Sequence, residues 1–439
     1  MDRFIILGGN KLSGQIKVSG AKNVAMKAIL AGLLTDKPIT VDNIPLISAV
    51  SGTAQILRLL GIKVVLNQDH TLKICGDNIK SHIIPLELGG LNRTATMVLG
   101  PLLSRFGKAV VPNPGGCRIG KRPIDRHIEG LRKMGVKIEY KEGYFYAQAD
   151  GLYGTRYKFE SNTHTGTETL ILAAVRAKGE TVLENAAQEP EVDDLIRLLN
   201  LMGAKIRRIQ RRTIVVKGVK ELNGAEFSIM PDRNEVVTFA IAAIASGGDI
   251  VVEGTQREYL KSFFSKLDEI NAGWEPISAD KTRFWAKGKL VSTQLKTMPY
   301  PGFMTDWQAP WVLLMSQAYG TSNVHETVYE DRFGYISELQ KMGAKAEFYN
   351  PEIDNPYQYY NFNWNDRKQG SYHAVKISGP TKLHNAVVEV ADLRAGATLV
   401  LGACIAEGES IIYGVSHIDR GYENLEGRLK SLGAQIRRE

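Results

Sequence analysis

One hydrophobic pattern recurs along the chain: leucines and methionines at helical spacing, then a glycine, then a short alternating segment. It reads LRLLGIKVV, LRKMGVKIE, LNLMGAKIR, LDEINAGWEP, LQKMGAKAE and LKSLGAQIR. Leu and Met at i, i+3 or i+4 predict an amphipathic helix with one buried stripe, and the glycine predicts its left-handed C-terminal cap. The alternation that follows, as in residues 137–140, predicts a half-buried strand.

A second pattern alternates with the first: a helix of small apolar residues, a glycine turn and a strand. It occupies residues 170–186, 239–254 and 399–415, with related versions at 28–44, 97–111 and 312–325. A helix without a polar face must be buried on nearly all sides. The two patterns together predict six units, each with strands, one buried helix and one outer helix.

The spacing of the units indicates the domain organisation. The shared glycines are Gly61, Gly135, Gly203, Gly273, Gly343 and Gly433. A chain of 439 residues is long for one core and suits two domains of roughly 200 residues, hence three units in each. The alternative, a solenoid of αβ repeats, is less favoured because the repeat exceeds the usual solenoid period of about 20–45 residues.

The last spacing is longer than the others, and the surplus lies in residues 350–373. This segment is rich in aromatic residues and has no clear period, so it predicts an inserted hairpin or loop between the fifth and sixth units. Exposed aromatic residues in a loop either form a surface for a protein partner or pack on their own domain. The second alternative is the commoner one.

Composition and charge narrow the functional classes. Hydrophobic residues make up 44% and charged residues 23%, as in soluble globular proteins. No apolar run reaches the ~20 residues that span a bilayer, and the amino terminus does not resemble a signal peptide. Three widely spaced cysteines favour a reducing cytoplasm, and no motif calls for a metal or an organic cofactor.

The formal net charge is +8, which has two possible meanings. A nucleic-acid-binding protein usually shows a cluster of Lys and Arg on a recognisable module, and no such module is evident. Several basic residues instead lie in glycine-bearing segments. This distribution favours a small anionic substrate, while a non-catalytic protein that binds nucleic acid or a partner stays open as an alternative.

The segment with the most chemical character is PNPGGCRIGKRPID, residues 112–125. Its paired glycines permit backbone conformations closed to other residues and are typical of a mobile lid. The cations around Cys117 favour a thiolate, which suits proton transfer to, or nucleophilic attack on, an anionic substrate. The alternative is a small residue that fills a tight turn. By contrast, Cys75 and Cys404 lie on apolar elements, where we expect buried, inert thiols.

No hydrolase partner set accompanies Cys117, because neither His127 nor His164 has an obvious orienting carboxylate in the sequence. Cationic residues stand in similar segments elsewhere, and one carboxylate, Asp306, has a comparable setting. The cationic residues are Lys22, Arg93, Arg332, Arg394 and Arg420. Together they predict a cleft that neutralises several negative charges and contains one acid and one base.

Motifs over the whole chain carry a family resemblance. They are SGAKN, PGGCRIGKRPIDRH, ENAAQEPE, PDRNE, TDWQA, ETVYEDRF, ADLRA and HIDRGYE, in this order. With them the chain resembles the enolpyruvyl transferases that act on UDP-N-acetylglucosamine. The resemblance implies a two-domain inside-out α/β barrel of six βαβ-type repeats. One domain would be 21–231, with the Cys117 lid loop, and the other 1–20 plus 232–439.

The resemblance also implies a reaction. The enzymes of this group transfer the carboxyvinyl group of phosphoenolpyruvate to the 3′-hydroxyl of UDP-N-acetylglucosamine and release phosphate, the first committed step of peptidoglycan precursor synthesis. Lys22, Asn23, Arg122 and Arg420 would hold phosphoenolpyruvate, with Arg332 and Arg394 completing a cationic wall. Cys117 would donate a proton and Asp306 would act as the base. The residues implied around the UDP-sugar are Arg93, Arg122, Pro123, Ile124, Asp125, Arg126, Asn162, Thr163, His164, Thr165, Asp306 and Val328.

The acceptor half departs from the family pattern. Where the family has a lysine followed by Ser-Val-Gly-Ala-Thr, this chain has NTHTGTE at 162–168. Asn162 thus removes an expected positive charge, Glu168 replaces a small residue, and Arg126 partly restores the charge. A carboxyvinyl transferase for another nucleotide or nucleotide sugar is therefore the alternative enzyme. The sister shikimate-3-phosphate enzyme fits less well, because its pattern lacks the lid cysteine.

If Cys117 performs the chemistry, the variant Cys117→Ser will resist inactivation by fosfomycin, the epoxide inhibitor of the family. The epoxide requires a thiolate nucleophile, which serine does not supply at neutral pH. The mass of the intact protein after incubation with fosfomycin measures the effect, because the adduct adds the mass of the inhibitor whether or not the variant is active. Equal modification of the variant and the unmodified protein would remove this thiol from the mechanism.

Overall fold

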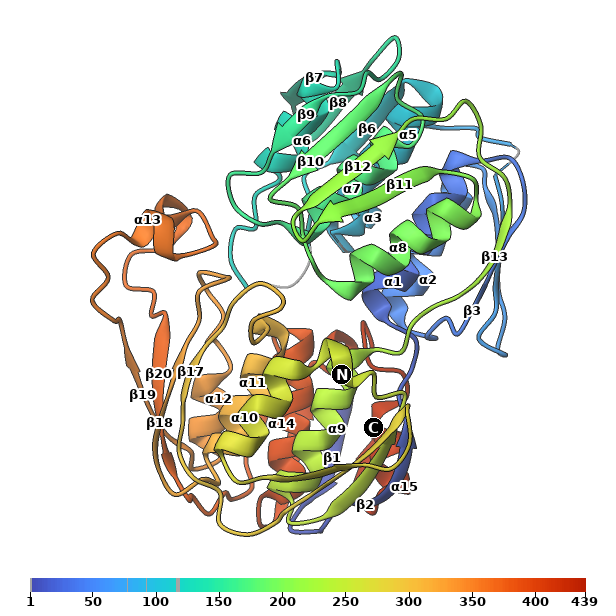
Figure 1. Cartoon of the computed structure of the whole chain (residues 1–439). Helices are drawn as coiled ribbons and strands as arrows, with labels where there is room; N and C mark the ends of the chain where they lie inside the picture. The colour runs from blue at the N-terminus through green and yellow to red at the C-terminus, as the bar shows by residue number, and fades with distance from the viewer. Residues whose placement is uncertain (1, 77, 92, 116–118) are drawn as a thin grey trace. The chain divides into compact units, whose positions relative to one another are not determined.

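The computed structural model describes residues 2–76, 78–91, 93–115 and 119–439, so Cys117 lies outside the described residues. The described chain divides into two compact units. One unit comprises residues 20–115 and 123–230, and the other comprises 2–19, 119–122 and 231–439. In Figure 1 the first is coloured from blue to yellow-green and the second mainly from yellow to red. Residues 119–122 thus group with the second unit.

The unit of residues 20–230 contains three largely buried helices: α1 (Lys22–Ala31), α5 (Leu99–Phe106) and α7 (His164–Ala174). Its outer helices are α2 (Ser48–Leu59), α6 (Asp125–Lys133) and α8 (Pro190–Leu201), and its shorter ones are η1 (Gly32–Leu34), α3 (Leu86–Leu91) and α4 (Thr94–Met97). The helices therefore sort into the buried and outer kinds that the two sequence patterns predict.

Three sheets cover these helices. The first has the order β13 (Ala225–Ser228), β3 (Ile39–Asp42), β5 (Leu72–Cys75), β4 (Lys63–Leu66). The second has the order β6 (Lys108–Pro112), β8 (Tyr144–Gln148), β7 (Lys137–Lys141), and the third β11 (Lys205–Gln210), β12 (Thr213–Lys217), β10 (Glu180–Glu184), β9 (Arg156–Lys158).

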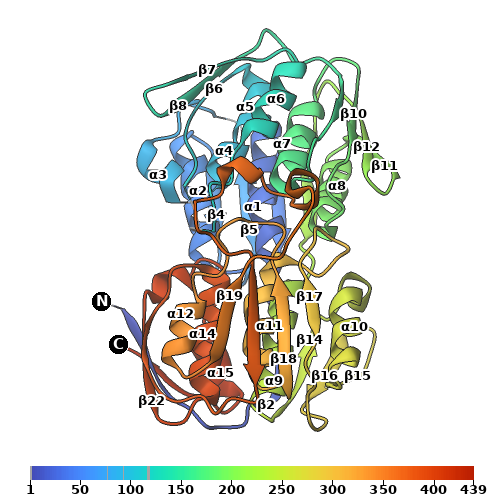
Figure 2. The ribbon, with the colours of Figure 1, turned by 90° about the vertical axis from the view of Figure 1, so that its left-hand side faces the viewer.

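The other unit repeats this plan. Its buried helices are α9 (Arg233–Ala245), α11 (Gln308–Met315) and α14 (Leu393–Ile405), and its outer helices are α10 (Lys261–Glu269), α12 (Ile336–Lys341) and α15 (Leu425–Ser431). Short helices are η2 (Arg257–Tyr259), η3 (Thr305–Trp307), α13 (Pro356–Tyr359), η4 (Trp364–Asp366) and η5 (Val415–His417). Figure 2 shows α9, α11 and α14 behind the strands of this unit.

The sheets of this unit draw on both ends of the chain. They are β15 (Gly273–Pro276), β16 (Lys281–Trp285), β14 (Asp249–Glu253), β2 (Ser13–Lys17); β17 (Gln294–Lys296), β18 (Gly320–His325), β20 (Ala374–Gly379), β19 (Lys345–Tyr349); and β21 (Val387–Glu389), β22 (Glu409–Tyr413), β1 (Arg3–Leu7), β23 (Gln435–Arg438). Strand β2 pairs in parallel with β14, and β1 lies between β22 and β23, antiparallel to both.

A shared strand pattern supports the internal repeat. Each four-stranded sheet contains one parallel pair and two antiparallel pairs. In the three-stranded sheet, the parallel neighbour of β6 is reduced to the single bridge between Ile83 and Val110. Six related sheets around buried helices confirm the prediction of an α/β fold with six units.

The glycine caps are confirmed in five of the six outer helices. Gly61, Gly135, Gly203, Gly343 and Gly433 all follow their helices with φ between 95° and 101°. In the fourth copy the prediction was wrong, because the left-handed residue is Asn271, with φ 62°. Gly273 instead begins β15, where a Cβ would collide with the Trp285 ring. Asn can take this role because its short side chain tolerates the left-handed region.

The aromatic segment 350–373 was predicted to lie between the fifth and sixth units, and this prediction was wrong. It connects β19 to β20, which pair with each other in one sheet, and Figure 1 shows α13 beyond the ends of these strands. The prediction failed because the strand that follows the segment returns to the same sheet. Several aromatics pack on their own unit: the rings of Tyr360 and Trp364 stack at 4.9 Å, and Phe362 is buried. Tyr357 and Tyr372 are exposed.

The two described cysteines differ. Cys404 is buried in α14, as expected, and burial raises the pKa of its thiol to about 12. Cys75 is only partly buried, contrary to expectation. Leu72 and Ile74 of β5 point into the core, so Cys75 falls on the other face of the strand. Among the helices of the described chain, none is both long and apolar enough to cross a membrane.

The two kinds of cap predict opposite responses to substitution. Gly203→Ala will lower the free energy of unfolding by about 1–2 kcal/mol, because an alanine must adopt the left-handed region. A Cβ there would meet only Asn223 Nδ2 at 3.5 Å, so the cost is conformational rather than steric. Asn271→Gly, the matched control, will cost nothing or stabilise slightly. Chemical denaturation followed by circular dichroism measures both, and equal losses would contradict the assignment.

Candidate functional site

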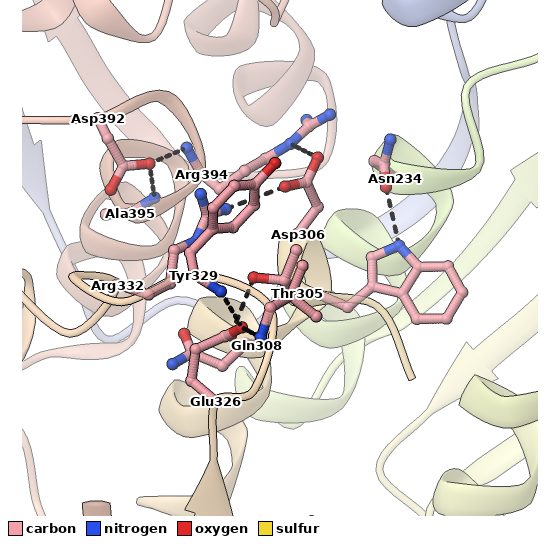
Figure 3. Close-up of polar contacts among 12 residues, drawn as sticks. Asn234, Thr305, Asp306, Gln308, Glu326, Tyr329, Arg332, Asp392, Arg394 and Ala395 are labelled. Carbon is pink, nitrogen blue, oxygen red and sulfur yellow. Dashed lines mark hydrogen bonds and ion pairs between the residues drawn. The ribbon is translucent and has the colours of Figure 1, made fainter. Parts of the chain in front are cut away.

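The carboxylate of Asp306 lies against two buried arginines. Arg332 donates from Nη2 to Asp306 Oδ1 at 3.0 Å, and Arg394 Nε lies 3.6 Å from Asp306 Oδ2 (Figure 3). The arginine side chains are only 4% and 5% exposed, whereas that of Asp306 is 26% exposed. The structure therefore brings the carboxylate together with two of the three cations that the sequence analysis singled out in this half of the chain, Arg332 and Arg394.

Both arginines keep their charge despite being buried. Burial by itself lowers the pKa of an arginine, but the negative charges of Asp392 and Asp306 raise the pKa of Arg332 above its ordinary value. For Arg394, burial is likewise outweighed by Tyr422 and Asp306, so its pKa is also raised. Two permanent cations beside one accessible carboxylate make a setting that can bind an anion and keep a base close to it.

Glu326 organises the loop that carries Arg332. Its carboxylate accepts hydrogen bonds from Thr305 Oγ1 at 2.9 Å and from the amides of Val328 at 2.7 Å and Tyr329 at 3.1 Å. Glu326 is fully buried, and burial raises the pKa of its carboxyl group. This one side chain ties the loop after β18 to the residue before Asp306, as the dashed lines in Figure 3 show.

The amino end of α14 orients Arg394. Asp392 precedes the helix and accepts hydrogen bonds from the amides of Arg394 at 2.9 Å and Ala395 at 3.2 Å. This is the usual capping arrangement for an aspartate. The Arg394 guanidinium lies 5.1 Å from the ring centre of Tyr422, whose hydroxyl is 2.7 Å from that of Thr238 on α9. Arg394 is therefore held at its backbone by Asp392 and at its guanidinium by Tyr422.

Residues 119–122 contact the loop after β18 that carries Arg332. The amide of Asp331 donates to Ile119 O at 3.3 Å, and the amide of Lys121 donates to the carboxylate of Glu330. Arg122 has φ 49°, and its guanidinium lies 5.5 Å from the ring centre of Tyr329. Arg122 thus contacts Tyr329 in the loop that carries Arg332.

Segment 119–122 is also tied to the aromatic segment 350–373. Lys121 Nζ lies 3.2 Å from Asp366 Oδ1, and Lys368 Nζ lies 2.9 Å from Asp331 Oδ2. Because Lys121, Lys368 and Asp331 are substantially exposed, each ion pair is weak by itself. Their joint effect is to connect the aromatic segment to both sides of the contact between residues 119–121 and 330–331.

A second group of predicted residues meets in the unit of residues 20–230. Arg93, which precedes α4, donates to Pro123 O at 2.8 Å, and His127 Nε2 lies 3.0 Å from Thr165 Oγ1. Burial, with the charges of Arg93 and Arg126, lowers the pKa of His127 to about 3. His127 is therefore a neutral, buried side chain, and Arg93, Arg126 and Thr165 lie around it.

The amino end of α7 carries the rest of the predicted acceptor segment. Thr163 caps the helix by accepting a hydrogen bond from the amide of Gly166 at 3.2 Å, and the Asn162 amide donates to Asn185 O at 3.3 Å. His164 Nε2 lies 3.1 Å from Glu168 Oε1. The expectation that His164 lacks an orienting carboxylate was wrong, because one helical turn brings residues i and i+4 together.

The remaining predicted residues take simple positions. Lys22 and Asn23 are the first two residues of α1, and Arg420 lies in the turn after η5. Ile124 is buried before α6, and Asp125 accepts a hydrogen bond from the amide of Arg126 at 2.9 Å. Among the described residues, no cluster of three or more His, Cys, Asp or Glu side chains is suited to hold a metal ion.

The chain is similar to known proteins over nearly its whole length. A model of the EPSP synthase (3-phosphoshikimate 1-carboxyvinyltransferase) family matches residues 6–429. The chain belongs to this carboxyvinyl (enolpyruvyl) transferase family. Two relatives named UDP-N-acetylglucosamine 1-carboxyvinyltransferase are 43% and 41% identical to it, from Koribacter versatilis and Acidobacterium capsulatum. Each match covers 100% of this chain and 96% of the relative.

Solved structures support the enolpyruvyl transferase fold. The enolpyruvyl transferase NikO from Streptomyces tendae superposes with a TM-score of 0.86 at 23% identity, over 100% of this chain and 98% of that one. EPSP synthase from Acinetobacter baumannii gives 0.76 at 18% identity, over the full length of both. At these identities the likeness concerns the fold. The family and the full-length relatives identify the chain as a transferase.

Several residues that shape this transferase were not found from the sequence. Glu326 and Asp392 hold the arginine-bearing segments, and Tyr329 lies under Arg122. Lys27 forms an ion pair with Glu168 at 3.1 Å in the interior. The sequence does contain a signal for Asp392, an aspartate just before a helix, and for Glu168, which stands four residues after His164. Nothing in the sequence indicates that a carboxylate at 326 turns back on two amides.

The buried His127 predicts a pH dependence of stability. Its folded-state pKa of about 3 is below the ordinary 6.5, so the unfolded chain binds more protons and stability falls as pH decreases from 6.5 toward 3. By pH 5 this histidine will cost about 2 kcal/mol relative to pH 7.5. Denaturant midpoints at both pH values for the unmodified protein and His127→Gln measure the difference.

In the His127→Gln variant this part of the pH dependence will be absent, because glutamine does not titrate. The variant His384→Gln, at an exposed position, will keep the difference of the unmodified protein. If His127→Gln retained the full difference between pH 7.5 and pH 5, a buried neutral histidine at this position would be contradicted.

Proposed function

We propose that the chain transfers the carboxyvinyl group of phosphoenolpyruvate to the 3′-hydroxyl of UDP-N-acetylglucosamine and releases phosphate. This is the first committed step of peptidoglycan precursor synthesis, and we place it in the cytoplasm. The observation that carries the choice of acceptor is the full-length similarity to two relatives named for this activity. The geometry around Asp306 supports the chemistry.

The reaction requires a proton on the methylene carbon of phosphoenolpyruvate, which makes its neighbouring carbon electrophilic. The sugar 3′-oxygen then forms a bond to that carbon and gives up its own proton. In a second stage a proton leaves the new methyl group and the carbon–oxygen bond to phosphate breaks. The protein must therefore supply one acid, one base and enough positive charge to hold a dense anion.

Asp306 is proposed as the base for the sugar hydroxyl. Its carboxylate is partly exposed, while its two arginine partners are buried and permanently charged. In this arrangement the arginines are fixed cations that do not compete for the proton, and they hold the carboxylate in a defined orientation. Pre-set charge of this kind lowers the barrier without reorganisation during the reaction.

The other roles follow from the family resemblance and are proposals for this chain. Cys117 donates the proton to phosphoenolpyruvate, and Lys22, Asn23, Arg122 and Arg420 bind its phosphate and carboxylate. The proposed acceptor contacts are Arg93, residues 122–126, residues 162–165, Asp306 and Val328. Two observations support these contacts. Arg93, Arg126 and Thr165 lie around His127. Glu326 accepts hydrogen bonds both from the amide of Val328 and from the hydroxyl of Thr305, the residue before Asp306.

The test is phosphate release from phosphoenolpyruvate, with UDP-N-acetylglucosamine, UMP and shikimate-3-phosphate compared as acceptors. We expect release that depends on UDP-N-acetylglucosamine. Release with UMP alone would make the changes at 162–168 a determinant of a different acceptor. Absence of release with all three acceptors would overturn the proposal.

Within the same assay, Asp306→Asn will lower kcat by about 100-fold or more, as expected for the loss of a positioned base. The KM for phosphoenolpyruvate will change much less, because the buried arginines remain. Asp354→Asn, at an exposed aspartate in the aromatic segment, is the matched control and will retain activity. An Asp306→Asn enzyme with full kcat would exclude Asp306 as the base.

A further inference from the structure

The aromatic segment 350–373 is anchored in its own unit by a cluster of rings. Tyr360 and Phe362 are buried, and their ring centres lie 4.8 Å apart. The ring of Tyr360 also stacks on that of Trp364 at 4.9 Å, and its hydroxyl lies 3.0 Å from His325 Nε2 at the end of β18. Aromatic rings in mutual contact bury a large apolar area in a defined geometry. The segment is therefore a packed part of this unit.

Backbone hydrogen bonds attach the same segment to the loop after β18 that carries Arg332. The amide of Asn361 donates to Thr327 O at 2.8 Å, and the amide of Glu326 donates to His373 O, also at 2.8 Å. Backbone groups shielded from water need such partners, so neither bond is lost without cost. The aromatic segment and the loop are thus joined at two places and keep a fixed relation to each other.

Two ion pairs extend this attachment to residues 119–122. Lys121 Nζ lies 3.2 Å from Asp366 Oδ1, and Lys368 Nζ lies 2.9 Å from Asp331 Oδ2. One negative and one positive side chain of the aromatic segment therefore each face a charge of the opposite sign. A shift of the segment along its partners would bring like charges together, so the two pairs also define its register.

Residues 119–122 include Arg122, which the proposed function assigns to phosphoenolpyruvate. Ile119 O accepts a hydrogen bond from the amide of Asp331 at 3.3 Å, and the Arg122 guanidinium lies 5.5 Å from the ring centre of Tyr329. Both contacts are made to the loop after β18, on which the aromatic segment also packs. The ion pairs of the aromatic segment therefore hold both partners of the contact that places Arg122.

We propose that the aromatic segment is a brace that holds residues 119–122 in place before substrate binds, and that Asp366 and Lys368 are positioning residues for Arg122. This rests on the proposed function, since Arg122 is a phosphoenolpyruvate contact only there. A segment that is ordered in the free enzyme does not have to be ordered during binding. The brace thereby raises the affinity for phosphoenolpyruvate without contacting it.

The first test uses the substrate-free protein and an endoproteinase that cleaves after lysine. Cleavage between Lys121 and Arg122 requires this part of the chain to leave its contacts, so the rate of the cut reports how often it does. In the double variant Asp366→Asn and Lys368→Met the cut will be about fivefold faster, the effect of losing two exposed ion pairs. Mass spectrometry of the fragments compares it with the cut after the exposed Lys220 in the other unit.

Two controls accompany this measurement. Asp354→Asn, at an exposed aspartate of the same segment, will be cut after Lys121 at the rate of the unmodified protein. Raising the salt concentration to about 0.5 M will speed the cut in the unmodified protein and leave the double variant unchanged, because exposed ion pairs are screened. Equal rates of this cut in the double variant and the unmodified protein would overturn the brace.

A charge reversal separates the ion pair from other effects of substitution. Lys368→Asp places a second carboxylate beside Asp331 and will speed the cut after Lys121. Lys368→Asp combined with Asp331→Arg restores opposite charges and will slow the cut again, as expected for residues that interact directly. A combined variant that is cut as fast as Lys368→Asp alone would contradict the role of this pair.

The consequence for the reaction is measured as the KM for phosphoenolpyruvate. The double variant Asp366→Asn and Lys368→Met will raise this KM about fivefold and leave kcat within about twofold, because the brace orders the free enzyme and does not act in the chemical step. Faster cleavage with an unchanged KM would refute the positioning of Arg122. If the unmodified enzyme released no phosphate with any acceptor, the proposed function would fail, and the cleavage rates would still decide whether the brace exists.

Discussion

The fold depends on helices that have no polar face. Along α9 and α14, nearly every side chain is buried, and α1, α7 and α11 are similar. Such a helix can be stable in water only if other elements surround it, and the six sheets and six outer helices provide that cover. The twofold use of one plan, three buried helices and three sheets in each unit, follows from this requirement.

The same constraint bears on where the candidate site residues lie. A helix that is apolar on nearly all sides admits a charged group along its length only where a partner is buried with it, as Lys27 is with Glu168. Other charged groups lie at its ends, where the amino end adds a partial positive charge and free amides. Lys22 begins α1, His164 begins α7, Asp306 lies just before α11, and Arg394 is the second residue of α14. The residues proposed to bind anionic substrates therefore lie at or beside the amino ends of helices whose remaining length serves mainly for packing.

Much of this was predictable because its signals are local. Helical leucine spacing, glycine caps and motifs in a fixed order are written in adjacent residues, and they predict the six units, the family and the candidate site residues. Where a local signal has two structural solutions, the prediction failed: Asn271 replaces Gly273 as the cap, and the segment before Ala374 returns to its own sheet. The buried partners Glu326 and Lys27 depend on which distant segments meet, and the sequence carries no local mark of that.

The position of β1 has a consequence for how the chain folds. This strand pairs with β22 and β23, so Arg3 lies opposite Tyr413 and Phe4 opposite Arg438. The unit that contains β1 therefore includes contacts of nearly the greatest sequence separation the chain allows, and closing them is slow. The unit of residues 20–230 is made of one continuous stretch apart from residues 119–122, and can form while the ribosome is still adding the rest. The first strand must wait, unpaired, until β22 has been synthesised, and its second neighbour, β23, follows later still.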